Sequence, residues 1–470
     1  MTKKQAEAHL PSRLLCGICF SLCFFAFMLT EAVVNERGAL LLGSRAVNLL
    51  YAFGLVCTGL GFLSFSLVRN ICRAEGSRKA ALLLAGALCL ASAAALLLSD
   101  RPVLFLASSA AALLLTGHIG GCVYYNTAMY FAGSRYTGRV IGVGMGAAIL
   151  LQFVVQELAA QSLVFIASLL LSVAFVMYFI IRAPKDWILE NPLPYSSEKR
   201  GDAKTMAALI AAVVLMSLVS GMIDSVLTAF HAEQACDVYS GVRLFYAFGL
   251  ALASFLADFR ERRCFPLATV CAMLLSSICM FFLSEEVGYF AGTALMYLYS
   301  GFYVLFFTVM FLDFAPKSGR PELWAGMGRI LRSFTVAATV LPALFLYDVL
   351  GSAALAAGSC LASIGILLVL LPHIGGAVAV PERDSEESAG QRELSPQERL
   401  ERYARRCSLT PRETEVLERL LTTDDDLQGI ADNLFISRRM VQRYVTSIYE
   451  KTETKSRLGL LQSFMRDQGK

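Results

Sequence analysis

The sequence predicts an all-α protein in which a helical membrane bundle precedes a small helical domain outside the membrane. Of its 470 residues, 56% are hydrophobic and only 17% are charged, and the mean hydropathy is +0.60. Soluble domains contain about 25% charged residues. Apolar runs long enough to span a bilayer recur from Leu14 to Leu371, whereas residues 409–470 alternate apolar and charged side chains at helical spacing.

Twelve spanning helices are expected in the apolar part of the chain, because each run has roughly the 20 residues that cross a hydrocarbon layer. The expected spans are 14–34, 46–68, 80–99, 102–125, 138–160, 161–182, 205–228, 241–259, 265–284, 288–312, 323–347 and 351–372. The first span follows a basic start but no small-residue cleavage site, which predicts an uncleaved helix.

The positive charges of the short loops predict the orientation. Lysine and arginine concentrate in every second connection, and such connections normally stay in the cytoplasm. The basic set comprises Lys3, Lys4, Arg13, Arg69, Arg73, Arg78, Lys79, Arg135, Arg139, Arg182, Lys185, Lys199, Arg200, Lys204, Arg260, Arg262, Arg263, Lys317 and Arg320. The alternate connections contain little beyond Arg37, Arg45, Arg101 and Arg243. An even number of spans then places both termini in the cytoplasm.

Two internal repeats indicate that residues 1–374 form two six-helix halves, 1–182 and 205–374. The sequence YAFGL occurs at 51–55 and again at 246–250, and Gly-Met-Gly occurs at 144–146 and at 326–328. The members of each pair lie at equivalent positions of the two halves with the same orientation, as in parallel repeats.

The loop after the eighth expected span carries LADFRERR at residues 256–263. This acidic-then-basic pattern resembles the loop signature of the major facilitator superfamily, with Phe259 and Glu261 in place of an Arg and a Gly. The corresponding loop near Arg69 lacks the signature. The resemblance implies a twelve-helix, major-facilitator-like bundle.

Residues 409–457 have the pattern of a helix-turn-helix. Thr410, Pro411 and Glu413 fit a helix start as N-cap, first helical residue and capping-box partner. The acidic run 424–426 offers caps for a second helix, and Ser437 caps a third. The residues predicted to face inward are Leu427, Ile430, Ala431 and Leu434 on the second helix and Met440, Val441, Val445 and Ile448 on the third.

The motifs LTPRExEVL, IAxxLxISxxxV, IYxK and KSRxxL follow one another between residues 409 and 460. They resemble the DNA-binding domain of LuxR-type transcription regulators. The resemblance implies a four-helix domain over 409–470 that binds double-stranded DNA as a homodimer. Gln442, Arg443 and Thr446 are expected to face the major groove, where Gln pairs with adenine and Arg with guanine. The expected phosphate contacts are Arg438, Arg439, Tyr444, Lys451 and Arg457.

Residues 375–408 are expected to link the two domains, with an acidic stretch at 381–387 and a short helix from Ser395 to about Arg406. Two interpretations of this helix stay open: it relays motion or helps two chains to pair, or it is only a spacer. On the final helix, Leu458, Leu460, Leu461 and Phe464 are candidates for a dimer surface, and some of them must pack the domain's own core.

Charged and polar side chains within the spans predict a ligand pocket, because such groups are costly in a bilayer and usually line a cavity or pathway. The candidates are Glu31, Asn48, Tyr51, Gln152, Gln156, Asp224, Arg243 and Tyr246. For Glu31 and Asp224, a location at the headgroup boundary is an equal alternative. Arg329 is expected either to pair with a carboxylate such as Asp313 or to extend to the headgroups.

The predicted function is a one-component transcription regulator in a bacterial cytoplasmic membrane, with a small-molecule inducer as ligand and lipid around its bundle. Some membrane regulators that join a bundle to a DNA-binding domain respond to small aromatic compounds. The resemblance to them implies a phenolic or catechol-like inducer. No catalytic, cofactor or metal motif stands out, so no enzymatic activity is expected. Two alternatives stay open: a secondary transporter whose tail regulates it, and a tail that binds protein instead of DNA.

Overall fold

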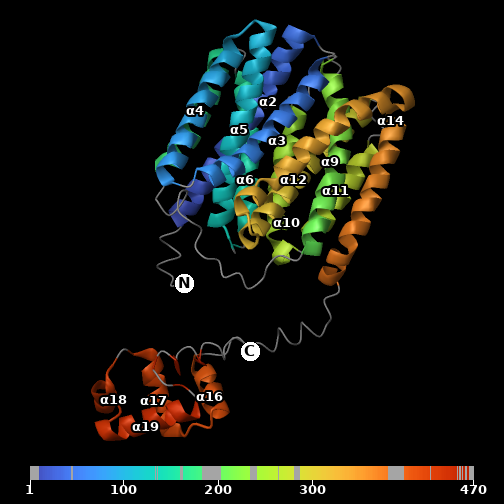
Figure 1. Ribbon diagram of the computed structural model, residues 1–470. Helices are drawn as coiled ribbons and strands as arrows, with labels where there is room; N and C mark the ends of the chain where they lie inside the picture. Colours follow the sequence, from blue (N-terminus) through green and yellow to red (C-terminus); the bar gives the residue numbers. More distant parts are fainter. Residues whose placement is uncertain are drawn as a thin grey trace. The chain divides into compact units, whose positions relative to one another are not determined.

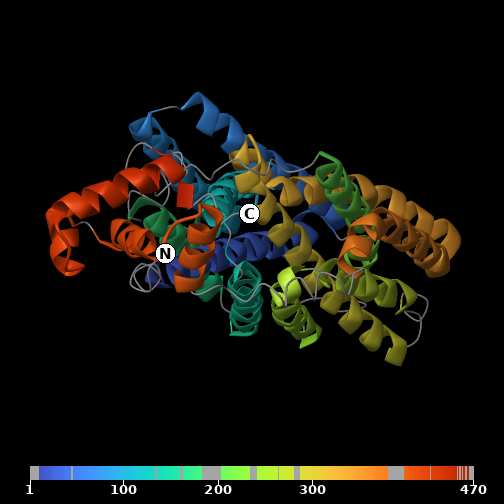
Figure 2. The same cartoon turned by 90° about the horizontal axis from the view of Figure 1, so that it is seen from below.

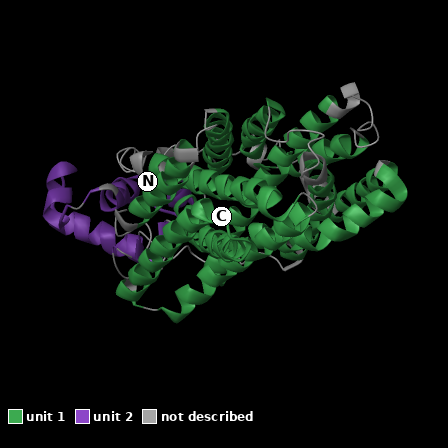
Figure 3. Ribbon diagram, turned by 90° about the horizontal axis from the view of Figure 1, so that it is seen from above, with its two compact units in different colours: residues 1–378 green, residues 379–470 purple. Residues whose placement is uncertain are grey.

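The computed structural model is helical throughout the residues that it describes, and no strand occurs among them, which confirms the all-α prediction. The described residues are 10–43, 46–72, 74–132, 134, 136–158, 162–182, 203–232, 241–262, 264–279, 286–378, 396–423, 425–452, 454, 457, 459–460 and 463–464. The chain divides into two compact units, residues 1–378 and 379–470 (Figures 1 and 3).

The first half of unit 1 contains six long apolar helices. They are α2 (Leu10–Leu42), α3 (Val47–Ile71), α4 (Glu75–Leu98), α5 (Pro102–Tyr130), α6 (Thr137–Leu158) and α7 (Ser162–Arg182). α3 packs along α5, and α2 contacts α5, α6 and α7. These helices are apolar on most of their surface, as expected where one side faces protein and the other lipid.

The second half begins with α9 and ends with a helix that turns back on itself. Its elements are α9 (Ala203–Ala232), η2 (Gly241–Arg243), α10 (Leu244–Ala257), η3 (Phe259–Arg262), α11 (Phe265–Cys279), α12 (Glu286–Phe314), η5 (Ala315–Lys317), α13 (Pro321–Trp324) and α14 (Met327–Val378). α14 covers both of the last two expected spans. Its direction changes at Gly351, whose φ of 75° and ψ of −176° are open to glycine almost alone.

Unit 1 has the apolar helices of a multi-pass membrane protein. Among the described residues, eight helices are long and apolar enough to cross a membrane, and four shorter apolar helices accompany them. Large apolar side chains such as Leu67, Leu98 and Phe345 are exposed on the outside of the unit, where lipid would cover them. The count of twelve spans stays a prediction.

The two halves of unit 1 lie side by side, with the blue-to-teal helices of the first half next to the green-to-orange helices of the second (Figures 1 and 2). α6 packs on α10, and α3 packs on both α9 and α14. The Asp258 carboxylate, in the loop after α10, accepts hydrogen bonds from the backbone N–H groups of Gly138 and Arg139, each at 2.8 Å. It therefore caps the first turn of α6 and joins the halves at this end.

Unit 2 has a hydrophobic core of its own. Its helices are α16 (Pro396–Arg406), α17 (Pro411–Thr422), α18 (Leu427–Asn433) and α19 (Arg438–Lys451). Leu417, Ile430, Val441 and Ile448 are fully buried at its centre. Tyr403 of α16 also belongs to this core, so the helix expected in the linker is part of the folded unit.

Candidate functional sites: the exposed face of α19 and a membrane cavity

The predicted recognition helix, α19, separates its apolar and polar residues onto opposite faces. Val441, Val445 and Ile448 are buried against α17 and α18, as predicted. The exposed face carries Arg438, Arg439, Gln442, Arg443 and Thr446. Positions spaced by three or four residues lie on one side of a helix, so these side chains form one continuous polar surface.

Two residues next to this surface differ from the expectations. Met440 was expected in the core, but 36% of it is exposed because it lies on the polar side of α19. Tyr444, an expected phosphate contact, is half-buried and packs against the core of unit 2.

Phe435 is 95% exposed in the turn before α19, where its φ is 54°.

Three caps set the starts of the helices, as the sequence predicts. Thr410 and Glu413 form a complete capping box at the start of α17. The Asp426 carboxylate accepts from the Gly429 N–H at 2.8 Å, and the Ser437 hydroxyl accepts from the Met440 N–H at 3.4 Å. These caps satisfy N–H groups that would otherwise have no partner in the first helical turns.

Glu413 also ties α17 to α19. Its carboxylate accepts hydrogen bonds from the Ser447 hydroxyl at 2.6 Å and from the Lys451 ammonium at 2.7 Å. These hydrogen bonds, together with those from Thr410, lower the pKa of Glu413 to about 2, although its burial acts in the opposite direction. Lys451, an expected phosphate contact, is therefore engaged within the domain.

Arg457 is likewise bonded to the domain itself. Its guanidinium donates to the backbone carbonyls of Leu420 at 2.9 Å and Asp425 at 2.8 Å, and also to that of Thr423. These carbonyls lie at the end of α17 and in the following turn, where helical partners are lacking. The geometry gives Arg457 a structural role in place of a free phosphate-binding one.

The C-terminal segment packs onto α16. Tyr403 donates a hydrogen bond to the Ser463 hydroxyl at 2.9 Å, and its ring meets that of Phe464 edge-on at 5.2 Å between centroids. Leu460 is fully buried. Two of the four dimer-surface candidates, Leu460 and Phe464, therefore pack the domain's own core, and the other two, Leu458 and Leu461, lie outside the described residues.

A cavity of ≈ 840 Å³, including its opening, lies among α2, α3, α9, α10, α12 and α14 of unit 1. Five of the eight predicted pocket residues line it: Glu31, Tyr51, Asp224, Arg243 and Tyr246. The tyrosines of the two YAFGL repeats are thus brought to one cavity, one from each half. Glu31 and Asp224 also line this one cavity between the helices.

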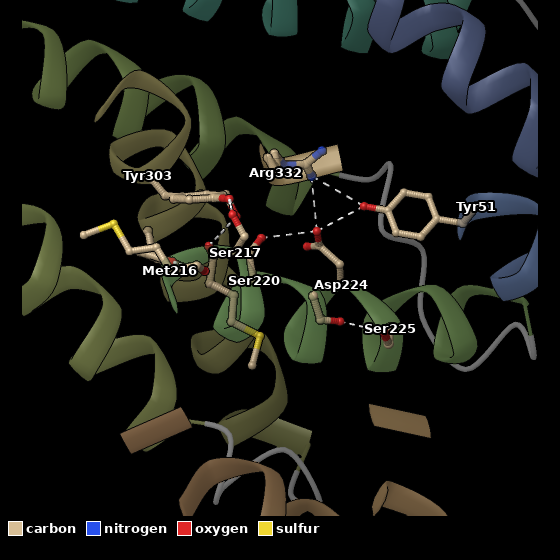
Figure 4. A network of polar contacts seen from close by, with 12 residues as sticks. Tyr51, Met216, Ser217, Ser220, Asp224, Ser225, Tyr303 and Arg332 are labelled. Carbon is tan, nitrogen blue, oxygen red and sulfur yellow. Dashed lines mark hydrogen bonds and ion pairs between the residues drawn. The ribbon is translucent and has the colours of Figure 1, made fainter. Parts of the chain in front are cut away.

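Asp224 is the centre of a polar network in this cavity (Figure 4). Its carboxylate accepts from the Tyr51 hydroxyl at 3.1 Å, from the Ser220 hydroxyl at 3.3 Å and from the Arg332 guanidinium at 3.3 Å. Tyr51 belongs to the first half, whereas the other three belong to the second. The network therefore connects the two halves across the cavity.

Arg329, one turn before Arg332 on α14, lines the same cavity. The expected pairing with Asp313 is wrong, because Asp313 pairs with Arg262. The expected extension to the headgroups is also wrong, since Arg329 is only 5% exposed and donates to the Tyr124 hydroxyl at 3.0 Å.

Three predicted pocket residues are not among those that line the cavity. Gln152 is fully buried and donates to the Met28 carbonyl at 3.2 Å, so it holds α6 to α2. Gln156 donates to the Glu36 carboxylate at 3.3 Å, and Asn48 is buried in α3. The lining residues that the prediction missed are Arg329, Arg332, Asn35, Ser220, Ser300, Tyr297, Tyr303, Phe27, Met28, Leu227, Met296 and Val304.

Comparisons with known proteins found one family match and one similar structure. Residues 407–464 match the family model of bacterial regulatory proteins, luxR family. The fold is similar to the crystal structure of the human organic anion transporter MFSD10 (TETRAN), with a TM-score of 0.56 and 15% identity. That match covers 77% of this chain and 99% of the transporter. The chain therefore joins a domain that matches the luxR-family model to a helical bundle with a fold like that of the transporter.

The family match confirms the resemblance to LuxR-type DNA-binding domains, and the similar structure confirms the fold expected of the bundle. No curated protein matches the whole or part of this chain significantly. Neither a helix-turn-helix domain nor a transporter-like bundle is typically an enzyme. At 15% identity, the likeness to the transporter concerns the fold alone.

Proposed function

We propose that the fusion is a membrane-embedded transcription regulator that senses a small ligand in the bundle cavity and binds promoter DNA through α19. The observation that carries the DNA-binding part is the exposed surface of Arg438, Arg439, Gln442, Arg443 and Thr446 on a capped helix of a luxR-family domain. Arginine and glutamine pair with guanine and adenine in the major groove, and further arginines neutralise phosphates.

The cavity supports the sensing part of the proposal. It is large enough for a small organic molecule, and polar and charged groups from both halves converge on it. A ligand that binds one packing of the halves more tightly than another shifts the population toward the first. The Tyr51–Asp224 hydrogen bond is one contact between halves that such a shift would alter.

We place both termini in the cytoplasm of a bacterium, where DNA is accessible, because the basic loops alternate along the chain. DNA-bound helix-turn-helix domains commonly act as dimers on two half-sites. A homodimer on DNA therefore belongs to the proposal, as does a small inducer with an aromatic body.

A DNA-binding titration tests this function. The affinity of residues 379–470 for labelled DNA is measured at a series of salt concentrations. The DNA is taken from the region upstream of the gene that encodes this chain. We expect affinity to fall steeply with salt, because phosphate contacts release counterions. Binding that is independent of salt, or equal for an Arg438→Ala/Arg443→Ala variant, would show that the domain does not read DNA in this way.

An uptake assay distinguishes the proposed regulator from the alternative, a secondary transporter with a regulatory tail. Full-length protein in liposomes is given a ligand that binds the cavity, and its accumulation is measured with and without an ion gradient. The regulator predicts binding without accumulation. Accumulation that is lost on Asp224→Asn would favour the transporter.

A further inference from the structure

We propose that the cavity takes a small organic acid and that Arg329 binds its anionic oxygen group. This inference rests on the proposed sensing function and specifies the chemical class of the ligand. The ligand class follows from three features of the cavity: a buried arginine with a donor to spare, an excess of positive charge, and aromatic walls.

Arg329 has hydrogen-bonding capacity that the described residues do not use. Its Nε donates to the Tyr124 hydroxyl at 3.0 Å, whereas its Nη2 is buried and has no hydrogen-bond partner among them. The guanidinium carries five N–H donors and does not lose its charge in proteins. An unsatisfied donor on a buried cation is costly, so the site favours a ligand that accepts hydrogen bonds.

Among the described residues that line the cavity, positive charges outnumber negative charges. Among its described lining residues, three arginines (Arg243, Arg329 and Arg332) face two carboxylates, Glu31 and Asp224. Asp224 is bonded to Arg332, and Glu31 interacts with all three arginines. With all five groups ionised, these described residues together carry one net positive charge in a region of low dielectric. One added anionic group would balance that charge.

Aromatic rings surround the guanidinium of Arg329, a residue that lines the cavity. The rings of Phe24, Phe27 and Phe307 have their centroids 5.1–5.3 Å from its central carbon. Arg329 and Phe27 line both the main cavity and a smaller apolar one, whose ≈ 290 Å³ also includes its opening. A carboxylate on Arg329 would therefore have apolar and aromatic surface beside it.

The body of the ligand is expected to be flat and apolar. Four tyrosines, Tyr51, Tyr246, Tyr297 and Tyr303, contribute rings to the main cavity. Aromatic walls with a few fixed polar groups are typical of sites that enclose small organic molecules. Together with the free donor of Arg329, this surface points to small aromatic carboxylates.

The test uses the purified full-length chain in lipid nanodiscs. The probes are benzoate, phenylacetate and 4-hydroxyphenylacetate, each compared with its neutral amide. Binding is measured by thermal shift and by calorimetric titration. We expect at least one carboxylate to bind while its amide does not. Arg329→Gln should weaken that binding by about tenfold or more, the loss expected for charge-assisted hydrogen bonds. The matched control is Arg320→Gln, an exposed arginine outside the cavity, which should bind as the wild type does.

Three results would overturn the assignment: no carboxylate of the set binds, amides bind as well as acids, or folded Arg329→Gln binds with unchanged affinity. If Arg329→Gln is not monodisperse, Arg329→Lys decides the matter, because it keeps the charge but loses the paired donors. Weaker binding by that variant supports the site, and wild-type affinity contradicts it.

DNA binding by the same samples separates this inference from the proposed function. A carboxylate that binds through Arg329 without changing DNA affinity supports the site and contradicts sensing. DNA affinity that responds only to neutral compounds supports sensing and contradicts the site.

Discussion

The Arg332 guanidinium of α14 donates to the Asp224 carboxylate of α9 across 3.3 Å, and the Tyr51 hydroxyl of α3 reaches the same carboxylate oxygen. Asp224 and Arg332 are 108 residues apart in the sequence. Their side chains are largely buried, with 20% and 12% exposed. Removal of Asp224 takes away the carboxylate that is bonded directly to the buried Arg332, which costs more than the pair itself contributes.

We therefore expect Asp224→Ala to lower the thermal stability of the full-length chain, by about 3 kcal/mol in free energy of unfolding. The response to any cavity ligand should be lost as well. The matched control is Ser225→Ala, because the Ser225 hydroxyl donates only to the Gly221 carbonyl of its own helix among the described residues. Equal melting temperatures and ligand responses for the two variants would show that Asp224 neither stabilises the bundle nor takes part in ligand binding.

Arg443→Ala and Arg438→Ala should weaken DNA binding in different ways. Arg443 is expected to contact a base, so its loss should cost about 1–3 kcal/mol and relax the preference at one position of the site. Arg438 is expected to contact a phosphate, so its loss should weaken binding to all sequences and reduce the salt slope by about 1. Competition with point-mutated DNA sites measures the difference. The control is Arg405→Ala on α16, an exposed residue that pairs with Glu401.

Arg457→Ala should act on stability. The side chain is bonded to three backbone carbonyls, which lose their partner in the variant. We expect the free energy of unfolding of residues 379–470 to fall by about 2 kcal/mol or more, as measured with urea. The folded fraction should bind DNA with an unchanged salt slope. If Arg457→Ala has wild-type stability but a smaller salt slope of DNA binding, Arg457 contacts a phosphate, as the sequence predicts.

Glu413 makes the stability of the DNA-binding unit depend on pH. The pKa of Glu413 falls from its ordinary 4.5 to about 2 in the folded state, so the ionised form stabilises the fold. That stabilisation is fully present above pH 4.5 and is lost as the pH falls toward about 2. Urea unfolding of residues 379–470 over this range should show a decline that Glu413→Gln reduces.

At neutral pH, Glu413→Gln should destabilise the unit by about 2 kcal/mol, because a cap and a charged hydrogen bond are weakened together. Glu415→Gln is the control, since Glu415 pairs with the exposed Arg412 on the same helix and contributes little. Parallel pH profiles for the wild type and Glu413→Gln would contradict the assignment.

The turn at Gly351 predicts a contrast between two glycines of α14. A Cβ on either Gly351 or Gly358 would meet no atom within 4 Å, so packing does not distinguish them. Only Gly351 has a positive φ, 75°. Gly351→Ala should therefore destabilise the bundle by about 1–3 kcal/mol, whereas Gly358→Ala should be neutral or stabilising. Melting curves of both full-length variants measure the difference, and identical curves would contradict the strain.

Local features were predictable from the sequence because their causes are local. The caps at Thr410, Asp426 and Ser437 depend on residues three positions apart. The apolar spans depend on composition alone. The wrong placement of Met440 has a simple reason: an apolar side chain at the edge of a helical stripe satisfies the pattern whether it is buried or exposed.

The cavity was only partly predictable because helix rotation and neighbour identity are not local. The spans identified Asp224 as a buried charge, but its partner Arg332 follows from the packing of α14 on α9. Gln152 appeared equivalent to the true lining residues, yet it faces α2 and bonds to the Met28 carbonyl. The contact of Arg329 with the Tyr124 hydroxyl likewise joins residues that are 205 positions apart in the sequence.

DNA occupancy of the full-length protein in cells tests whether the membrane-inserted chain binds promoter DNA. The tagged chain is crosslinked in growing cells, isolated from the membrane fraction, and its bound DNA is sequenced. We expect the wild type to enrich a promoter region and the folded Arg438→Ala/Arg443→Ala variant to lose that enrichment. Absence of enriched DNA from a membrane-inserted wild type, or equal enrichment by that variant, would contradict this expectation.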